Sequence, residues 1–167
     1  MSRKDLWAAA LGEGFLILAV ALVGFATYHP FVFASLGPTA YEQVETPERP
    51  SARPYNVILG HILAVAAGYA AIAILQAWNT PPVSAHGVPL PRVWTAVLAC
   101  VFTVIATQLA RATQPAALAT ALLVSLGLMQ SWVDGGIIIA AVLLIACIGE
   151  PIRRLRVRQR SSSTPSL

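Results

Sequence analysis

Apolar residues along this chain gather into five long stretches, separated by short polar or proline-rich segments. The stretches cover residues 6–27, 56–78, 93–110, 115–130 and 135–150. A helix needs about 20 consecutive apolar residues to cross the hydrocarbon core of a bilayer. The first two stretches reach this length and the others come close to it. The pattern therefore predicts a helical membrane protein.

The fourth stretch decides between two folds. From Pro115 to Gly127 it would form only about 20 Å of helix, which is shorter than a hydrocarbon core of about 30 Å. Continued through Trp132, it becomes just long enough to span. Length alone therefore leaves both four and five spans open.

An internal similarity favours four spans. After the first stretch come Tyr28-His29-Pro30 and a short apolar piece that reaches Ser35-Leu36-Gly37, and after the third come Thr113-Gln114-Pro115 and a piece that reaches Ser125-Leu126-Gly127. Each is followed by a further long stretch, an order found in transporters built from repeats. The sequence predicts an all-α membrane protein with four transmembrane helices and two short, proline-started re-entrant half-helices in a two-fold internal repeat. Five transmembrane helices are the alternative.

Prolines and charges place the connecting segments. The loop over residues 41–54 contains Pro47, Pro50 and Pro54, and we expect it to be a stiff, non-helical crossing on the outer face. The arginines between residues 153 and 160 supply most of the net charge of +4 and are expected at the cytoplasmic end. We expect one domain over residues 1–160 and a polar, disordered tail over residues 161–167.

The composition excludes several classes of function. Hydrophobic residues make up 57% of the chain and charged residues 11%, too few to cover a soluble protein. Cys100 and Cys147 lie inside apolar stretches and are interpreted as packing residues. The sequence contains no metal-ligand spacing, phosphate-binding glycine motif or catalytic motif. We therefore expect no enzyme activity, no cofactor, no bound metal and no nucleic-acid partner.

Polar residues interrupt the apolar pattern where a substrate or ion path would need them. Glycine and proline free backbone N–H groups, hydroxyls add donors, and the N-terminus of a half-helix favours a small anion. His61 is either a donor lining the path or an interfacial histidine bonded to a loop. Thr39 and Thr120 either line the path or satisfy the neighbouring backbone. The candidates are Ser35, Gly37, Thr39, Asn56, His61 and Thr120.

Two arginines and three small residues complete the candidates. Arg53 and Arg111 lie at predicted helix ends, where they form an electropositive rim or serve as snorkelling anchors. Gly60, Ala64 and Gly68 recur every four residues, a spacing that lets helix backbones approach closely. This packing is expected either within the bundle or between subunits.

The chain resembles the HPP family of integral membrane proteins. The resemblance rests on Ser35-Leu36-Gly37-Pro38-Thr39-Ala40, on the segment from Pro50 to Val57, and on Gly60-His61. The family's His-Pro-Pro motif is usually followed by Ala-Gly-Ala-Thr-Ala. Here Gln114 replaces the histidine, Ala116 the second proline and Leu118 the glycine, while Pro115 and Ala119-Thr120-Ala121 match. The resemblance implies four spans and a relation to nitrite transporters.

We predict an integral membrane transporter or channel-like carrier for a small inorganic anion, with nitrite as the first candidate. The alternative is a non-transporting scaffold, sensor or accessory subunit with the same fold. The expected partners are the lipid bilayer, the anion and further copies of the chain in a homo-oligomer. The expected location is a bacterial inner membrane, with the C-terminus in the cytoplasm.

Overall fold

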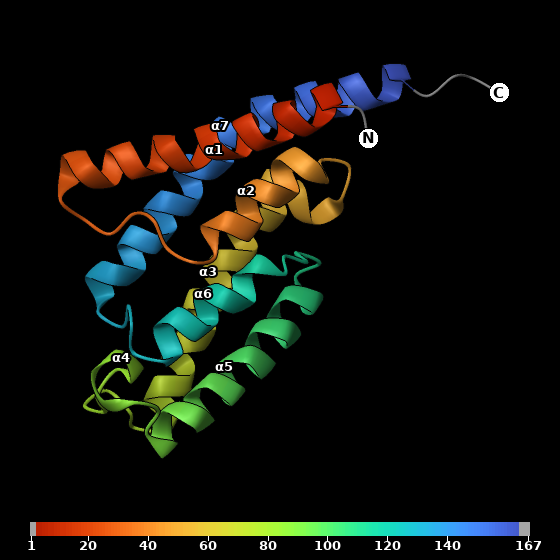
Figure 1. Ribbon diagram of the computed structural model, residues 1–167. Helices are drawn as coiled ribbons and strands as arrows, with labels where there is room; N and C mark the ends of the chain where they lie inside the picture. The colour runs from red at the N-terminus through yellow and green to blue at the C-terminus, as the bar shows by residue number, and fades with distance from the viewer. Residues whose placement is uncertain (1–2, 164–167) are drawn as a thin grey trace.

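The computed structural model describes residues 3–163 of the chain, and its regular structure is helical throughout (Figure 1). Seven α-helices and one short 3-10 turn, η1, occur in this range, which contains no strand. The elements are α1 (Arg3–Thr27), α2 (Leu36–Glu45), η1 (Pro50–Ala52), α3 (Pro54–Ile74), α4 (Val83–His86), α5 (Leu90–Leu109), α6 (Ala116–Ser125) and α7 (Trp132–Ser163).

Four of the helices, α1, α3, α5 and α7, are long and apolar enough to cross a membrane. The most exposed of them is α1, which leaves Leu11, Phe15, Leu22 and Phe25 more than half accessible. An apolar surface of this kind is suited to contact with lipid or with another protein chain. The protein is a multi-pass integral membrane protein with four candidate spans, as the repeat in its sequence predicts.

Both predicted short helices are present, but the first begins later than expected. Residues 28–35 are not helical, and α2 starts at Leu36. Pro38 then falls in the first turn, where its missing N–H breaks no intrahelical hydrogen bond. The second short helix, α6, begins directly after Pro115 as expected and is ended by Gly127, whose φ is +80°.

Each short helix runs back along the long helix that precedes it. Phe31 packs against Gly24 near the end of α1, and Val44 packs against Gly12 near its start. At the end of α6 the Ser125 carbonyl accepts a hydrogen bond from Thr95, near the start of α5. This course differs from the expected re-entrant one, in which a half-helix returns to the end where it starts. The non-helical residues 28–35 add length that α2 lacks, because residues outside a helix can span more than the 1.5 Å that a helical residue adds.

The connection over residues 41–54 lies beside the end of α7. Its first residues belong to α2, so only the part after Glu45 lacks regular α-helix. Arg160 forms ion pairs with Glu45 and Glu48 at 3.4 Å, and Arg156 Nε donates to the Val44 carbonyl at 3.2 Å. The expectation that this connection and the C-terminal arginines lie on opposite faces is therefore wrong. Opposite charges hold them together.

The C-terminal segment is helical further than expected. Helix α7 continues through Ser163, three residues into the predicted tail. Residues 164–167 of that tail lie outside the described residues.

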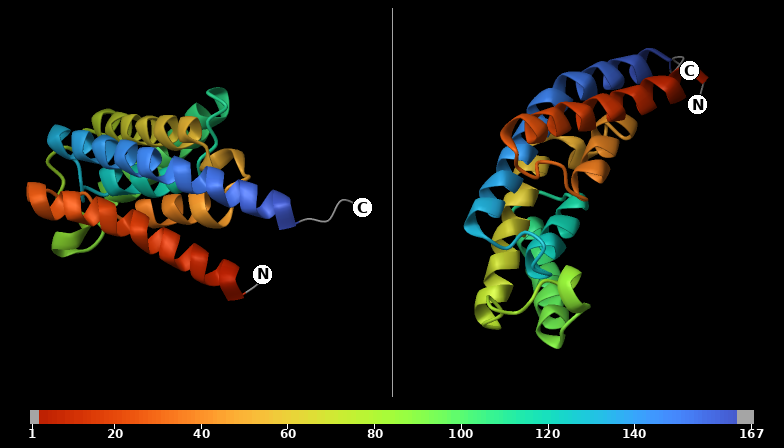
Figure 2. Two further views of the ribbon diagram at one scale, coloured as in Figure 1. Left: turned by 90° about the horizontal axis from the view of Figure 1, so that it is seen from above. Right: turned by 60° about the vertical axis from the view of Figure 1, so that its left-hand side comes forward.

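The two halves of the chain repeat the order long helix, short helix, long helix. In each half the short helix packs against the long helix before it and against the last helix of the other half: α2 against α1 and α7, and α6 against α5 and α3. Both termini lie at one end of the molecule, while α4 and its neighbouring loops join α3 to α5 at the other (Figures 1 and 2). The halves therefore run in opposite directions, and α2 and α6 meet between them.

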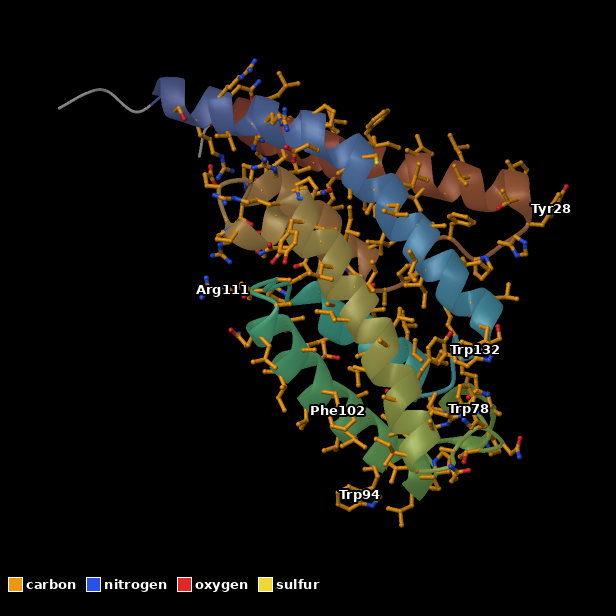
Figure 3. All side chains as sticks on the ribbon, turned by 180° about the vertical axis from the view of Figure 1, so that it is seen from behind. Tyr28, Trp78, Trp94, Phe102, Arg111 and Trp132 are labelled. Atoms are coloured by element: carbon orange, nitrogen blue, oxygen red, sulfur yellow. The ribbon has the colours of Figure 1, made fainter. Side chains whose placement is uncertain are left out.

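The two ends of the bundle differ in chemistry, as Figure 3 shows. We call the end that holds residues 45–53, 110–113 and 153–160 the arginine end. At the other, aromatic end, the rings of Tyr69, Trp78 and Trp132 pack together with centroids 4.6–6.0 Å apart. Tryptophan and tyrosine favour the membrane–water interface. The cluster is positioned to anchor this end there.

Candidate functional site

A connected group of four polar side chains lies where α2, α3 and α6 meet. The Ser35 and Thr120 hydroxyl oxygens are 2.7 Å apart. His61 Nδ1 lies 2.7 Å from Thr120 Oγ1, and His61 Nε2 lies 3.1 Å from Thr39 Oγ1. All four residues are fully buried, at 0% exposure. The structure thus brings together four of the six residues that the sequence places in the path.

Local structure explains how these residues meet. Ser35 is the N-cap of α2, and Thr39 lies one turn further along the same helix. His61 comes from α3 and Thr120 from α6. The first short helix thus supplies two members and the second supplies one, which is why the meeting of the halves creates the group.

The stripe of small residues on α3 sets the distance between α3 and α6. A Cβ atom on Gly60 would lie 2.7 Å from Gln114 Cβ, and one on Gly68 would lie 2.7 Å from Val124 Cβ. Ala64 between them is fully buried. The stripe therefore packs against α6 within the chain, and this close approach lets His61 reach Thr120.

Hydrogen counting assigns a direction to each bond of the four-residue group. The Thr39 hydroxyl donates its single hydrogen to the Ser35 carbonyl at 2.8 Å, so its oxygen accepts from His61 Nε2–H. A neutral imidazole with this tautomer accepts at Nδ1, where the Thr120 hydroxyl donates. Ser35 in turn donates to Thr120. Every hydroxyl hydrogen then has an acceptor, with a neutral His61.

Gly37 and Asn56 lie outside this group. Gly37, in the first turn of α2, is partly exposed, and nothing lies within 4 Å of the position that its Cβ would take. Asn56 is in the first turn of α3, where its Nδ2 donates to the Thr113 carbonyl at 3.2 Å. It ties α3 to the segment before α6, closer to the arginine end than His61.

Arg53 and Arg111 lie on neighbouring segments of the arginine end. Both side chains are exposed, and the Tyr55 hydroxyl donates to the Ala110 carbonyl at 3.1 Å, which joins the two segments. Figure 3 shows Arg111 at the margin of the bundle. Two exposed cations from separate parts of the sequence therefore lie on neighbouring segments, and the electropositive rim remains a prediction for them.

Three buried residues near the arginine end carry unpaired polar atoms that sequence reasoning missed. Glu42 Oε2 and both side-chain amide atoms of Gln43 and Gln114 have no hydrogen-bond partner among the described residues. Gln43 packs against Gly149 of α7, while Gln114 packs against Gly60 of α3. The sequence pattern predicts a loop at Glu42 and Gln43, although they follow Thr39 at the three- and four-residue spacing of one helix face.

Arg92 is a further residue whose role the sequence did not indicate. It is fully buried at the start of α5, and its guanidinium donates to the carbonyls of Thr80, Pro81 and Ser125 and to Gln130 Oε1. No ion pair among the described residues includes it. The Ser125 carbonyl belongs to the last turn of α6, where a cation is favoured by the helix dipole. Arg92 thus fastens α6 and two loops at the aromatic end.

The described residues contain no group of three or more His, Cys, Asp or Glu side chains that could hold a metal ion. The four-residue group offers hydroxyls and one imidazole, and no carboxylate takes part in its hydrogen bonds. Chemically, it can bind a small polar or anionic molecule through neutral donors.

Comparison with known proteins assigns the family. The chain belongs to the family described as HPP, transmembrane region, whose model matches residues 1–159. This confirms the family inferred from the two motifs around Gly37 and Asn56. No curated protein and no solved structure matches the chain.

Proposed function

We propose that this HPP family member is a transporter or channel-like carrier for a small inorganic anion, with nitrite as the first candidate. The observation that supports the proposal is the buried group of Ser35, Thr39, His61 and Thr120 at the junction of the two inverted halves. In proteins built from such repeats, substrate sites lie at the interface between the halves, where helices are interrupted. The resemblance to nitrite transporters supplies the candidate substrate.

The chemistry of the group suits an anion that is weakly held. It supplies three O–H groups and one N–H group from neutral side chains, without a fixed positive charge that would trap the ion. Because each of these hydrogens already has an acceptor within the protein, an anion must replace some of those acceptors when it binds. A small movement of α2 relative to α6 would open the Ser35–Thr120 contact and free hydroxyls for it.

Positive charge lies near both ends of the proposed path. Arg53 and Arg111 face solution at the arginine end, and Arg92 is buried at the aromatic end without an acidic partner among the described residues. Charges of one sign near an entrance raise the local concentration of the opposite ion. A homo-oligomer remains part of the proposal. Its contact surface lies elsewhere than the stripe of Gly60, Ala64 and Gly68, which α6 covers.

The test is nitrite flux into liposomes that contain the purified protein. We expect flux in the wild type and at least about a tenfold loss in Thr39→Val and His61→Ala, since each removes a donor from the group. Thr103→Val is the matched control, because Thr103 is equally buried but its hydroxyl bonds only to the Ala99 carbonyl of its own helix. Absence of flux in the folded wild type would rule out the proposal.

The second candidate function is a membrane scaffold, sensor or accessory subunit that does not transport. It is favoured by the complete burial of the four-residue group and by Gln114, which replaces the family's histidine in the resemblance above. A folded wild-type protein that carries no anion tested in the same liposomes would support this candidate.

A further inference from the structure

The unpaired polar atoms around Glu42 require an explanation of their own. Glu42 is 9% exposed and Gln114 only 3% exposed. Glu42 Oε2, Gln114 Oε1 and Gln114 Nε2 all lack a hydrogen-bond partner among the described residues. A buried polar atom without a partner is destabilising, because it loses its hydrogen bonds to water and gains none. Three such atoms in adjacent side chains point to a bound species that pairs them.

The charged groups around Glu42 do not neutralise it. Glu45, Glu48 and Glu150 each pair with arginine, whereas no ion pair among the described residues includes Glu42. Burial raises the pKa of Glu42, while the Ser51 hydroxyl, the Gln114 amide and the charge of Arg49 lower it to a smaller extent.

The arginines of the neighbouring helix α7 bond to other groups. Arg153 pairs with Glu150 and donates to the Pro47 carbonyl, while Arg156 pairs with Glu45 and donates to the Val44 carbonyl of α2. From α1, Glu13 lines a groove with Tyr41, Val44 and Glu45. The groups that act on the Glu42 carboxyl are therefore two neutral side chains, Gln114 just before α6 and Ser51 in η1, and one cation, Arg49.

Hydrogen counting identifies the missing species as a proton. An ionised Glu42 can accept a hydrogen bond from Gln114 Nε2, but it leaves Gln114 Oε1 without a donor. A protonated Glu42 donates its O–H to Gln114 Oε1 and accepts from Gln114 Nε2 at its other oxygen. The neutral pair thus satisfies all three unpaired atoms with two hydrogen bonds.

We propose that Glu42 and Gln114 form a buried proton-binding pair. This site lies outside the four-residue group and its ligand is a proton, not an anion. It does not depend on whether the protein transports nitrite. The pair lies next to that group. Glu42 follows Thr39 by three residues on α2, and Gln114 packs against Gly60, the residue before His61. Loss of the proton would therefore disturb α2 and α6 beside the path.

The direct test is pH-difference infrared spectroscopy of the purified protein in lipid nanodiscs. We expect a C=O band of a protonated carboxyl that persists above the usual glutamate pKa of about 4.3 and disappears in Glu42→Gln. Glu45→Gln is the matched control, because it removes an ion-paired carboxyl from the next turn of the same helix and should leave the band in place. A band unaffected by Glu42→Gln, or no such band in the wild type, would overturn the proposal.

A second measurement uses stability and a second variant. Because the folded protein holds the Glu42 proton more tightly than the unfolded chain, the proton's contribution to stability is complete below pH about 4 and is lost as pH rises through the folded pKa. The unfolding midpoint of the wild type should fall over that range, and that of Glu42→Gln should fall less. If Glu42→Gln does not fold, the infrared measurement is made on Gln114→Met. This change should shift the frequency and the titration of the C=O band, and an unchanged band would contradict the proposal that Glu42 and Gln114 form a pair.

Discussion

At the scale of single residues, the number of hydrogens available to donate decides how His61 and the hydroxyls of Thr39, Thr120 and Ser35 are arranged. Each hydroxyl has one hydrogen, and the Thr39 hydrogen is used on the Ser35 carbonyl. This choice sets the imidazole tautomer and then the direction of every other bond in the group. One helix-capping residue and three residues inside helices therefore act as a unit, so that changing one of them alters the bonds of the others.

Removal of the Thr120 hydroxyl should be costly because two neighbours depend on it. In Thr120→Val, His61 Nδ1 loses its donor and the Ser35 hydroxyl loses its acceptor, both in a fully buried position. At about 1–3 kcal/mol for each of the two unpaired groups, we expect a loss of about 2–6 kcal/mol in the free energy of unfolding. Thermal unfolding in detergent measures it.

The control is Thr103→Val on α5. That hydroxyl donates only to the Ala99 carbonyl of its own helix at 2.7 Å, so its removal should cost less than about 1 kcal/mol. Equal losses in the two variants would contradict the hydrogen-bond assignment.

At the scale of elements, the contact between α3 and α6 controls whether the four-residue group can form. The space that a side chain on Gly68 would need is occupied by Val124 of α6, and at Gly60 it is occupied by Gln114, just before α6. The spacing of small residues was evident in the sequence. The partner helix was not, because a stripe of this kind fits equally well against any helix with a complementary surface.

Substitution of Gly68 should separate these two helices. In Gly68→Ala the new methyl group would lie 2.7 Å from Val124 Cβ, which forces a shift. Overpacking of this kind costs about 1–3 kcal/mol. We expect a lower unfolding midpoint together with reduced nitrite flux.

Two further variants test the cause of that loss. Adding Val124→Gly removes the opposing atoms and should restore part of both signals. Gly136→Ala, where nothing lies within 4 Å of the new methyl group, should leave both unchanged. Failure of the double variant to recover, with a normal Gly136→Ala, would show that steric contact with Val124 is not the cause.

At the scale of the whole molecule, the inverted halves fix which segments share a side of the membrane. The connection over residues 46–53 and the end of α7 lie together at the arginine end, because Glu45 and Glu48 pair with Arg160. The loops around α4 lie at the other end, with the aromatic cluster (Figure 3).

This arrangement predicts the side from which added cysteines react. In a background that lacks Cys100 and Cys147, we expect Glu48→Cys to react with an impermeant thiol reagent from the same side as a reporter fused to the C-terminus. Val88→Cys should react only from the opposite side. Right-side-out and inside-out vesicles measure this directly. Labelling of both positions from one side would contradict the inverted arrangement.

Several properties could be predicted from the sequence because they depend on local pattern. The length of the apolar stretches identifies the spans, and the repeated order of long and short segments favours four of them over five. Proline positions mark helix starts, as at Pro54 and Pro115. The motif residues Ser35, Thr39, His61 and Thr120 were likewise recognisable as polar groups out of place in hydrocarbon.

Only the tertiary structure decided which of these residues meet and which segments share an end. Ser35 and Thr120 are 85 positions apart, and their contact depends on how two short helices from opposite halves pack. The partners of Glu42, Gln114 and Arg92 also come from distant segments. Local pattern determines which elements form, since it acts through neighbours in the chain. Long-range packing and charge pairing determine how they are placed, and no single stretch of sequence contains both partners.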